Sequence, residues 1–421
     1  MKRMDFLATC AAGLVGGAIV PRMVHAESTV PHSWPSVSSD EERFWEFLRD
    51  QFPLTRDRAY FNTGGLGASP FAVIDAVKSK TDELEYASET GHNEELWKSV
   101  KGSAAKLLGC DATEFAFMRN TTEGINVVAH GLPFKEGDEI ILTTHEHVGN
   151  ALTWMPLAKQ KGLTLRLFEP STASAEENLA RISTLFSRRT RLISIPHIVT
   201  TTGLLLPVKE ICALAHTRGV WCFLDGAQSA GMMPFNLHDI ACDAYATSGH
   251  KWLLGPKETG LLYVRKEMLD SIVPMFIGAY SADFDFLKGS YSYEPSAQRY
   301  EYGTVSTPLR YGLGAAISFI QRIGIETVWK RDRALADHLY TGLRAIPGVT
   351  VLSSPSPDLR SAMITFMHDR LPHLEMQKHL DTDNLRTRSV TEGGLAALRI
   401  STHIYNSFEE VDRVIAGVRS A

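Results

Sequence analysis

The sequence predicts an α/β fold, with a large, mostly parallel sheet domain wrapped by helices and a smaller α+β domain at the C-terminal end. First, 421 residues are more than one compact core usually holds. Second, short apolar runs alternate with helical patterns between residues 100 and 265, which is typical of a parallel sheet covered on both faces. Third, the pattern changes after about residue 310, where two long helical stretches precede short strands.

Six near-continuous apolar runs in the first part are predicted strands. They span residues 139–142, 164–168, 191–195, 220–224, 244–247 and 260–264. Helical patterns between them cover residues 175–186 and 208–217. Because strands and helices alternate in this way, we expect ligands to bind just beyond the carboxyl ends of the strands.

The second part begins with predicted helices over residues 311–323 and 326–343. Strands are expected at 350–352 and 362–366, and an amphipathic helix at 408–418 closes the chain. A helical pattern at 39–52 is expected to pack on this smaller domain. The predicted divisions are an N-terminal segment (27–58), a large ligand-binding domain (59–308) and a small domain (309–421).

The first 26 residues have the layout of a signal peptide. Lys2 and Arg3 precede an uncharged run over residues 6–20, and Ala26 ends a small-x-small cleavage motif. The run is too short to span a bilayer comfortably, so no membrane span is expected after its removal. We expect a periplasmic or secreted protein. Residues 2–7 resemble a twin-arginine export signal without its paired arginines; export that stops only when the general secretion channel is lost would contradict that route.

Composition and cysteine spacing limit the classes of ligand that the protein is expected to bind. The chain has 43 basic and 48 acidic residues, a formal charge of -5, and offers no basic field for nucleic acid. A C-x-x-C or metal-ligand spacing is absent from the cysteines that follow the signal peptide, Cys110, Cys212, Cys222 and Cys242. A small-molecule substrate is therefore expected, and no metal is indicated.

Two predicted strand ends carry residues suited to pyridoxal 5′-phosphate (PLP). Asp225 directly follows the strand at 220–224, and Lys251 comes shortly after the strand at 244–247. A carboxylate keeps the pyridine nitrogen of PLP protonated, so that the ring can accept the electrons of a broken substrate bond. A lysine amine holds the cofactor as an imine and shuttles protons. Either residue alone is weak evidence, because strand-end aspartates often cap turns and most lysines are solvated.

Small hydroxyl residues at a predicted helix start add a candidate anion site. Thr121 and Thr122 follow Asn120 at the opening of an apolar helical pattern. Backbone N–H groups and the helix dipole at such a start attract a phosphate. The alternative is an ordinary N-cap with no ligand.

The motifs DGAQS at 225–229 and SGHKW at 248–252 resemble the two central motifs of the aminotransferase class V family of fold-type I PLP enzymes. This family includes cysteine desulfurases and isopenicillin N epimerase. The resemblance implies a Schiff base on Lys251, a pyridinium partner in Asp225 and a hydrogen bond from Gln228 to the ring hydroxyl. It also implies a phosphate site made by Thr121, Thr122, Ser248 and His250.

Further resemblances extend along the chain. His147, after Glu146, resembles the family histidine that stacks on the PLP ring and relays protons. The segment at 301–304 is similar to one by which a partner subunit reaches the phosphate, so Thr304 implies a homodimer. Arg399 resembles the arginine that binds the substrate carboxylate with its guanidinium fork. Two further residues, Asn62 and Thr200, are expected on the substrate side.

The sequence departs from the desulfurase pattern at one decisive place. Desulfurases need a nucleophilic cysteine shortly before the carboxylate arginine, and residues 385–398 contain none. The threonine-rich segment 200–203 is instead closer to the epimerase branch. We therefore expect an exported PLP enzyme that racemises, transaminates or otherwise acts at the amine-bearing carbon of an amino acid.

Three other expectations stay open at this point. Exported relatives that tailor peptide siderophores such as pyoverdine make a peptide-linked amino acid a credible substrate. One alternative is a C–S lyase, or desulfurase-like enzyme, that works without the catalytic cysteine. Another is a non-catalytic protein that uses the PLP fold for binding.

Overall fold

The computed structural model describes residues 42–421, which belong to one compact unit. The predicted signal peptide and the start of the 27–58 segment lie outside the described residues. Within residues 42–421, no helix combines the length and apolar character needed to cross a membrane.

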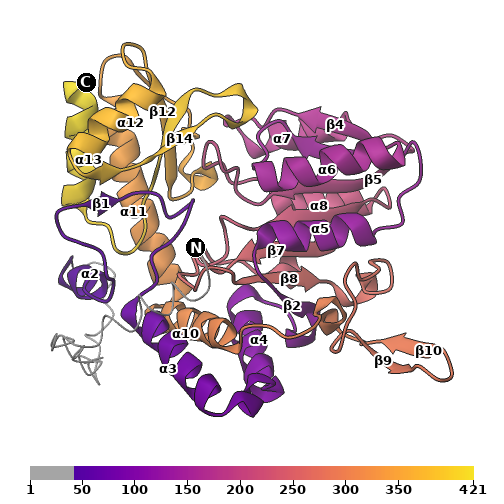
Figure 1. Ribbon diagram of the computed structural model, residues 1–421. Coiled ribbons are helices and arrows are strands. Elements are labelled where there is room, and N and C mark those ends of the chain that lie inside the picture. Colours follow the sequence, from indigo (N-terminus) through magenta and orange to yellow (C-terminus); the bar gives the residue numbers. More distant parts are fainter. Residues whose placement is uncertain (1–41) are drawn as a thin grey trace, which may run out of the picture. The chain divides into compact units, whose positions relative to one another are not determined.

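A seven-stranded sheet forms the centre of the larger part (Figure 1). Its strands lie in the order β2-β8-β7-β6-β5-β3-β4, and only β8 runs antiparallel to its neighbours. The strands are β2 (Phe115–Met118), β3 (Glu139–Thr143), β4 (Thr164–Phe168), β5 (Thr190–Pro196), β6 (Trp221–Asp225), β7 (Ala244–Ser248) and β8 (Gly260–Val264). The mostly parallel sheet and its six expected strands are confirmed, and β2 is an additional edge strand.

Both faces of this sheet are buried, because neighbouring residues of one strand belong to different hydrophobic clusters. Ile140 packs with Ile125 and Trp154 on one face, whereas Ile141 packs with Ile211 and other residues on the opposite face. The helices of the larger part are α3 (Phe71–Tyr86), α4 (Glu94–Leu108), α5 (Thr121–Gly131), α6 (Val148–Lys161), α7 (Ala175–Ser183), α8 (Val208–His216), α9 (Leu237–Ile240) and α10 (Thr307–Ile323). This two-sided burial explains the near-continuous apolar runs of the strands.

A smaller antiparallel sheet follows, with the order β11-β12-β15-β14. It consists of β11 (Val349–Val351), β12 (Met363–His368), β14 (Arg388–Val390) and β15 (Ala397–Ser401). The helices α11 (Ile325–Arg344), α12 (His373–Thr382) and α13 (Phe408–Ser420) supply its cover, with Leu339, Leu380 and Val414 in a shared core with Ile400. The expected α+β pattern is thus present, while the boundary at 308/309 stays a prediction.

The N-terminal helix α2 (Glu42–Arg49) is held by ion pairs to the C-terminal helices. Arg331 donates to both oxygens of Glu42 at 2.7 Å, and Arg49 lies 2.5 Å from Glu410. Next, the short strand β1 (Ala59–Tyr60) pairs in parallel with β13 (Leu385–Arg386), and Asn62 bridges to Ser401. Because of these pairings, residues 59–67 run along the smaller sheet and reach the carboxyl ends of the strands of the large sheet, where the Gly67 N–H donates to the His250 carbonyl.

A hairpin of β9 (Ala282–Asp285) and β10 (Ser290–Tyr293) projects away from the large sheet (Figure 1). Its apolar side chains are unusually open to solvent, with Phe284 75%, Phe286 86% and Leu287 97% exposed. Large exposed apolar patches mark interaction surfaces more often than chance.

Candidate active site

A cavity of about 320 Å³ opens where β6, β7 and the start of α5 meet. This is the position that the parallel-sheet rule predicts for a ligand. The cavity is lined by Gly64, Gly65, Asn120, Thr121, Thr122, His147, Thr200, Asp225, Ala227, Ser248, His250, Lys251 and Arg388. Most of the predicted site residues therefore come together; the exceptions are Asn62, Gln228, Thr304 and Arg399.

Lys251 is almost fully buried, with 8% of its surface exposed. Burial lowers the pKa of Lys251 to about 8, and Arg399 and Arg388 lower it further in the same direction against the opposing charge of Asp225. A substantial fraction of the amine is therefore neutral near physiological pH. Neutral amine is the form that attacks a carbonyl carbon or accepts a proton.

Asp225 ends β6 with its carboxylate at the floor of the cavity. One oxygen accepts a 2.9 Å hydrogen bond from the Ala227 N–H. Burial raises the pKa of Asp225, while this hydrogen bond and the charge of Lys251 lower it. A buried carboxylate needs a cationic partner to stay ionised, and a protonated pyridine nitrogen is such a partner.

The opposite wall of the cavity fits a phosphate group. Asn120 caps α5 by accepting from the Glu123 N–H at 3.0 Å, and Thr121 Oγ1 lies 2.7 Å from Ser248 Oγ. The Nδ1 atom of His250 is buried and has no hydrogen-bond partner within residues 42–421. An unpartnered buried polar atom beside a helix start is the environment that an anion completes.

His147 caps α6 and keeps its imidazole neutral. The Gly149 N–H donates to Nδ1 at 3.1 Å, so the ring proton is on Nε2. Burial lowers the pKa of His147 to about 4, with the cations Lys251 and Arg388 acting in the same direction. The ring is thus uncharged at neutral pH, suited to stacking, and offers a donor at Nε2.

Arg399 lies one layer behind the cavity wall, fully buried in the middle of β15. Its Nη1 donates to the Thr200 carbonyl at 2.7 Å and to Thr200 Oγ1 at 2.8 Å, and Nη2 lies 3.4 Å from Asn62 Oδ1. A Cβ at Gly64 would come within 2.9 Å of Nη2, so the chain passes close over the guanidinium here and a larger residue would displace it. Burial lowers the pKa of Arg399 to about 9, which leaves it cationic at neutral pH.

Both the nitrogen and the oxygen of the Gln228 side-chain amide form hydrogen bonds with other residues of the protein. Its Nε2 donates to the Gly64 carbonyl at 2.9 Å and to Thr200 Oγ1 at 3.1 Å, and its Oε1 accepts from Trp252 at 2.8 Å. Gln228 therefore fixes the strand-end loop that carries Asp225. The hydrogen bond to a ring hydroxyl stays a prediction.

Thr304 lines a second cavity of about 280 Å³, together with Arg119, Tyr302 and Arg310 among others. It does not line the Lys251 cavity of its own chain. Sequence reasoning also missed Arg388, which does line that cavity. The sequence signal is Arg388 itself, a cation in the segment 385–398 that precedes Arg399.

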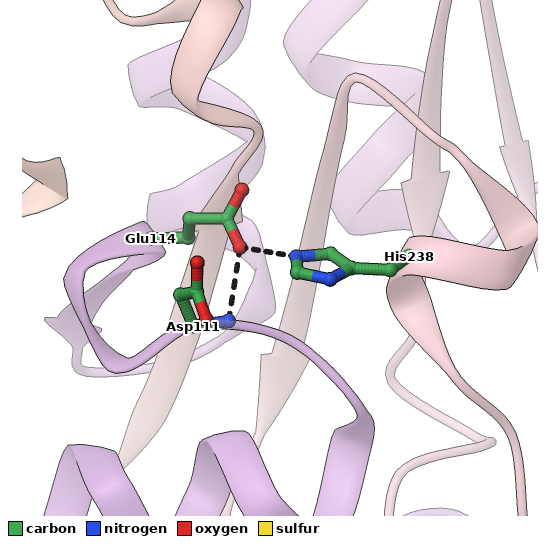
Figure 2. Close-up of side chains that lie close together, drawn as sticks. All are labelled: Asp111, Glu114 and His238. Atoms are coloured by element: carbon green, nitrogen blue, oxygen red, sulfur yellow. Dashed lines mark hydrogen bonds and ion pairs between the residues drawn. The ribbon is translucent and has the colours of Figure 1, made fainter.

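A separate cluster of ligand-type side chains lies at the end of α4 (Figure 2). His238 donates to Glu114 at 2.6 Å, and the Asp111 N–H donates to the same oxygen at 3.0 Å. The other Glu114 oxygen accepts from the Lys266 N–H at 3.2 Å. Both oxygens of Glu114 are thus occupied by protein donors, and the cluster joins the Asp111 turn to α9.

Comparisons with known proteins agree with this geometry. The family profile described as aminotransferase class-V matches residues 79–414. A probable cysteine desulfurase of Mycobacterium leprae is 30% identical over 404 residues, covering 89% of this chain and 96% of the relative. A probable cysteine desulfurase of Halalkalibacterium halodurans is 32% identical over 379 residues. The match covers 85% of this chain and 92% of the relative.

Two solved structures of the protein C-DES are similar throughout. One, a lysine-to-alanine mutant with glycine covalently linked to the PLP cofactor, has a TM-score of 0.81 at 27% identity and covers 88% of this chain and 98% of its own. The other is a complex of the cystine C–S lyase C-DES with cysteine persulfide. It has a TM-score of 0.82 at 27% identity, and the match covers 88% of this chain and 99% of its own. With a profile match along most of its length and a cavity suited to the cofactor, the chain belongs to the aminotransferase class-V family and is a PLP-dependent enzyme.

Proposed function

We propose that the protein is a C–S lyase that cleaves the Cβ–S bond of a sulfur-bearing α-amino acid without a catalytic cysteine. One observation carries this proposal: Lys251 and Asp225 line a cavity whose described lining contains no cysteine. Cys212, Cys222 and Cys242 are buried in the core beneath the sheet, and Cys110 packs against that core. Residues 42–421 therefore offer no thiol there to receive sulfur from the substrate, and sulfur would leave with the product.

The relatives support a sulfur substrate over the epimerase branch expected from the threonine-rich segment. The two curated relatives are named probable cysteine desulfurases, and one solved neighbour is described as a cystine C–S lyase. A desulfurase-like cavity whose described lining lacks a cysteine fits a C–S lyase better than an enzyme that transfers a persulfide.

The chain's own residues divide the work of binding and proton transfer. PLP, when bound, withdraws electrons from the α-carbon as its proton leaves. With PLP in the cavity, Asp225 would hold the proton on the ring nitrogen, and the neutral imidazole of His147 would stack on the ring. Arg399 does not itself line the cavity, but its buried Nε has no hydrogen-bond partner among the described residues, and we assign the substrate α-carboxylate to this arginine on the family resemblance.

Lys251 is the group placed to move the α-proton. Its lowered pKa leaves part of its amine free to accept that proton. Loss of the proton and of the sulfur substituent then makes a Cα=Cβ double bond. With one water, the substrate R–S–CH₂–CH(NH₂)–COOH gives R–SH, pyruvate and ammonia, so no external oxidant or reductant is needed.

The assay incubates the PLP-loaded enzyme with a panel of S-substituted L-cysteines and L-cystine. We expect thiol or persulfide, detected with a thiol reagent, and pyruvate, detected with lactate dehydrogenase, in a 1:1 ratio. Cys110→Ser is the matched control, because Cys110 is the one cysteine of residues 42–421 that is not fully buried. Its activity should equal that of the wild type.

Two results would contradict the lyase proposal. Loss of activity in Cys110→Ser would point to sulfur transfer through a protein thiol. Proton NMR in heavy water that shows deuterium at a scrambled α-carbon, with no thiol or keto product, would instead support an epimerase.

We also propose that the enzyme is a homodimer in which Thr304 completes the phosphate site of the partner subunit. The separate location of Thr304 and the exposed apolar β9–β10 hairpin support a second copy. Sedimentation of the active enzyme should give twice the chain mass. A fully active monomer would contradict this arrangement.

A further inference from the structure

Two arginines occupy directly opposite positions on neighbouring strands of the smaller sheet. Arg388 on β14 pairs in register with Arg399 on β15. Side chains at opposite positions of an antiparallel pair extend from the same face, and like charges there are destabilising. The fold tolerates this cost beside the cavity that holds Lys251, where an anion would offset it.

The two arginines differ in what they can reach. Arg399 is fully buried behind Gly64, whereas the Arg388 side chain is 27% exposed and lines the cavity. Arg388 donates from Nη2 to Glu392, which is the one hydrogen-bonding partner that residues 42–421 give its side chain. A guanidinium has five N–H donors in a planar fork, so Glu392 holds part of the fork and further donors of this cavity-lining residue stay available to a ligand.

Because Glu392 already pairs with Arg388, a second anion would be attracted by the unused N–H donors of the guanidinium and not by an unbalanced charge. The cofactor phosphate belongs at the start of α5, and the substrate α-carboxylate belongs at Arg399. Arg388 lowers the pKa of Lys251, His147 and Arg399, which shows that its charge acts on each of them. Glu392 is the acidic side chain paired with it, and a ligand carboxylate is the natural second partner.

We infer that Arg388 binds an anionic group at the far end of the substrate side chain, so that the preferred substrate is an α-amino acid with a second carboxylate. Glu392 acts as a positioning residue that holds the guanidinium fork toward the cavity. The inference rests on the proposed function for the orientation of the substrate, with its α-carboxylate at Arg399.

Equilibrium binding to the PLP-loaded enzyme tests the inference without requiring turnover. Calorimetry would compare L-aspartate, L-glutamate and L-2-aminoadipate with the neutral L-asparagine, L-glutamine and L-norleucine. In the wild type, at least one acid should bind about 10-fold to 100-fold more tightly than its neutral counterpart, the range expected of a charge-assisted hydrogen bond. None of these probes carries sulfur, so a failed lyase assay would leave this result unaffected.

Variants then assign the preference to one side chain. Arg388→Gln should weaken binding of the preferred acid by about 10-fold or more and change binding of its neutral counterpart by less than about twofold. Arg388→Lys should restore part of the preference, because it keeps the charge without the fork. The matched control is Arg386→Gln, since Arg386 does not line the cavity and lies 3.8 Å from Asp381. It should bind like the wild type.

Two outcomes would overturn the inference. A wild type that binds acids and neutral amino acids equally has no distal anion site, and this comparison needs no variant. Equal weakening of both probe classes by Arg388→Gln would mean that Arg388 holds the α-carboxylate, or only pins the segment that carries Glu392.

Discussion

Lys251→Ala should lose the long-wavelength absorbance of the bound cofactor and reduce turnover by at least about 1000-fold. The reason is that Lys251 supplies both the amine that would hold PLP and the base that accepts the α-proton, and no other lysine lines the cavity described within residues 42–421. Absorbance spectra and the thiol-release assay on the purified variant measure the two losses separately.

Lys266→Ala is the matched control for this variant. The Lys266 side chain is solvent-exposed, and the hydrogen bonds of this residue are made by its backbone, whose N–H donates to Glu114 and whose carbonyl accepts from the Leu269 N–H. It should keep the wild-type spectrum and rate. A Lys251→Ala enzyme that still turns over substrate would overturn the assignment of the site, and with it the proposed lyase.

Asp225→Asn should keep cofactor in the cavity but lower kcat by about 100-fold to 1000-fold, the usual cost of removing one preorganised charge from a site. Asparagine has nearly the shape of aspartate and can still accept from the Ala227 N–H, which Asp225 does at 2.9 Å. It carries no charge with which to hold a proton on the ring nitrogen. The measurement is kcat together with the amount of PLP bound per chain.

Asp239→Asn provides the control, because Asp239 is exposed on α9 and does not line the cavity. Its kcat should not change. If Asp225→Asn were as active as the wild type, the ring nitrogen would not depend on this carboxylate. If the variant bound no PLP at all, the loss would be one of binding and not of electron withdrawal.

Much of the site could be predicted because its parts are local in the sequence. Asp225 and Lys251 each follow an apolar run, and Thr121 opens a helix. In a parallel sheet the carboxyl ends of all strands meet at one edge, so residues far apart in the chain converge there without any knowledge of long-range contacts. The short strand β2 escaped prediction because four apolar residues do not distinguish a strand from a helix.

The sequence by itself determined the fold class, the strand ends that carry the chemistry and the absence of a cysteine before Arg399. Only the tertiary structure decided which arginine faces the cavity. That choice depends on the register of β14 against β15 and on the passage of Gly64 over Arg399, two residues that lie far apart in the chain. Local patterns specify neither strand register nor close packing between distant segments, so the position of Arg388 became visible only in three dimensions.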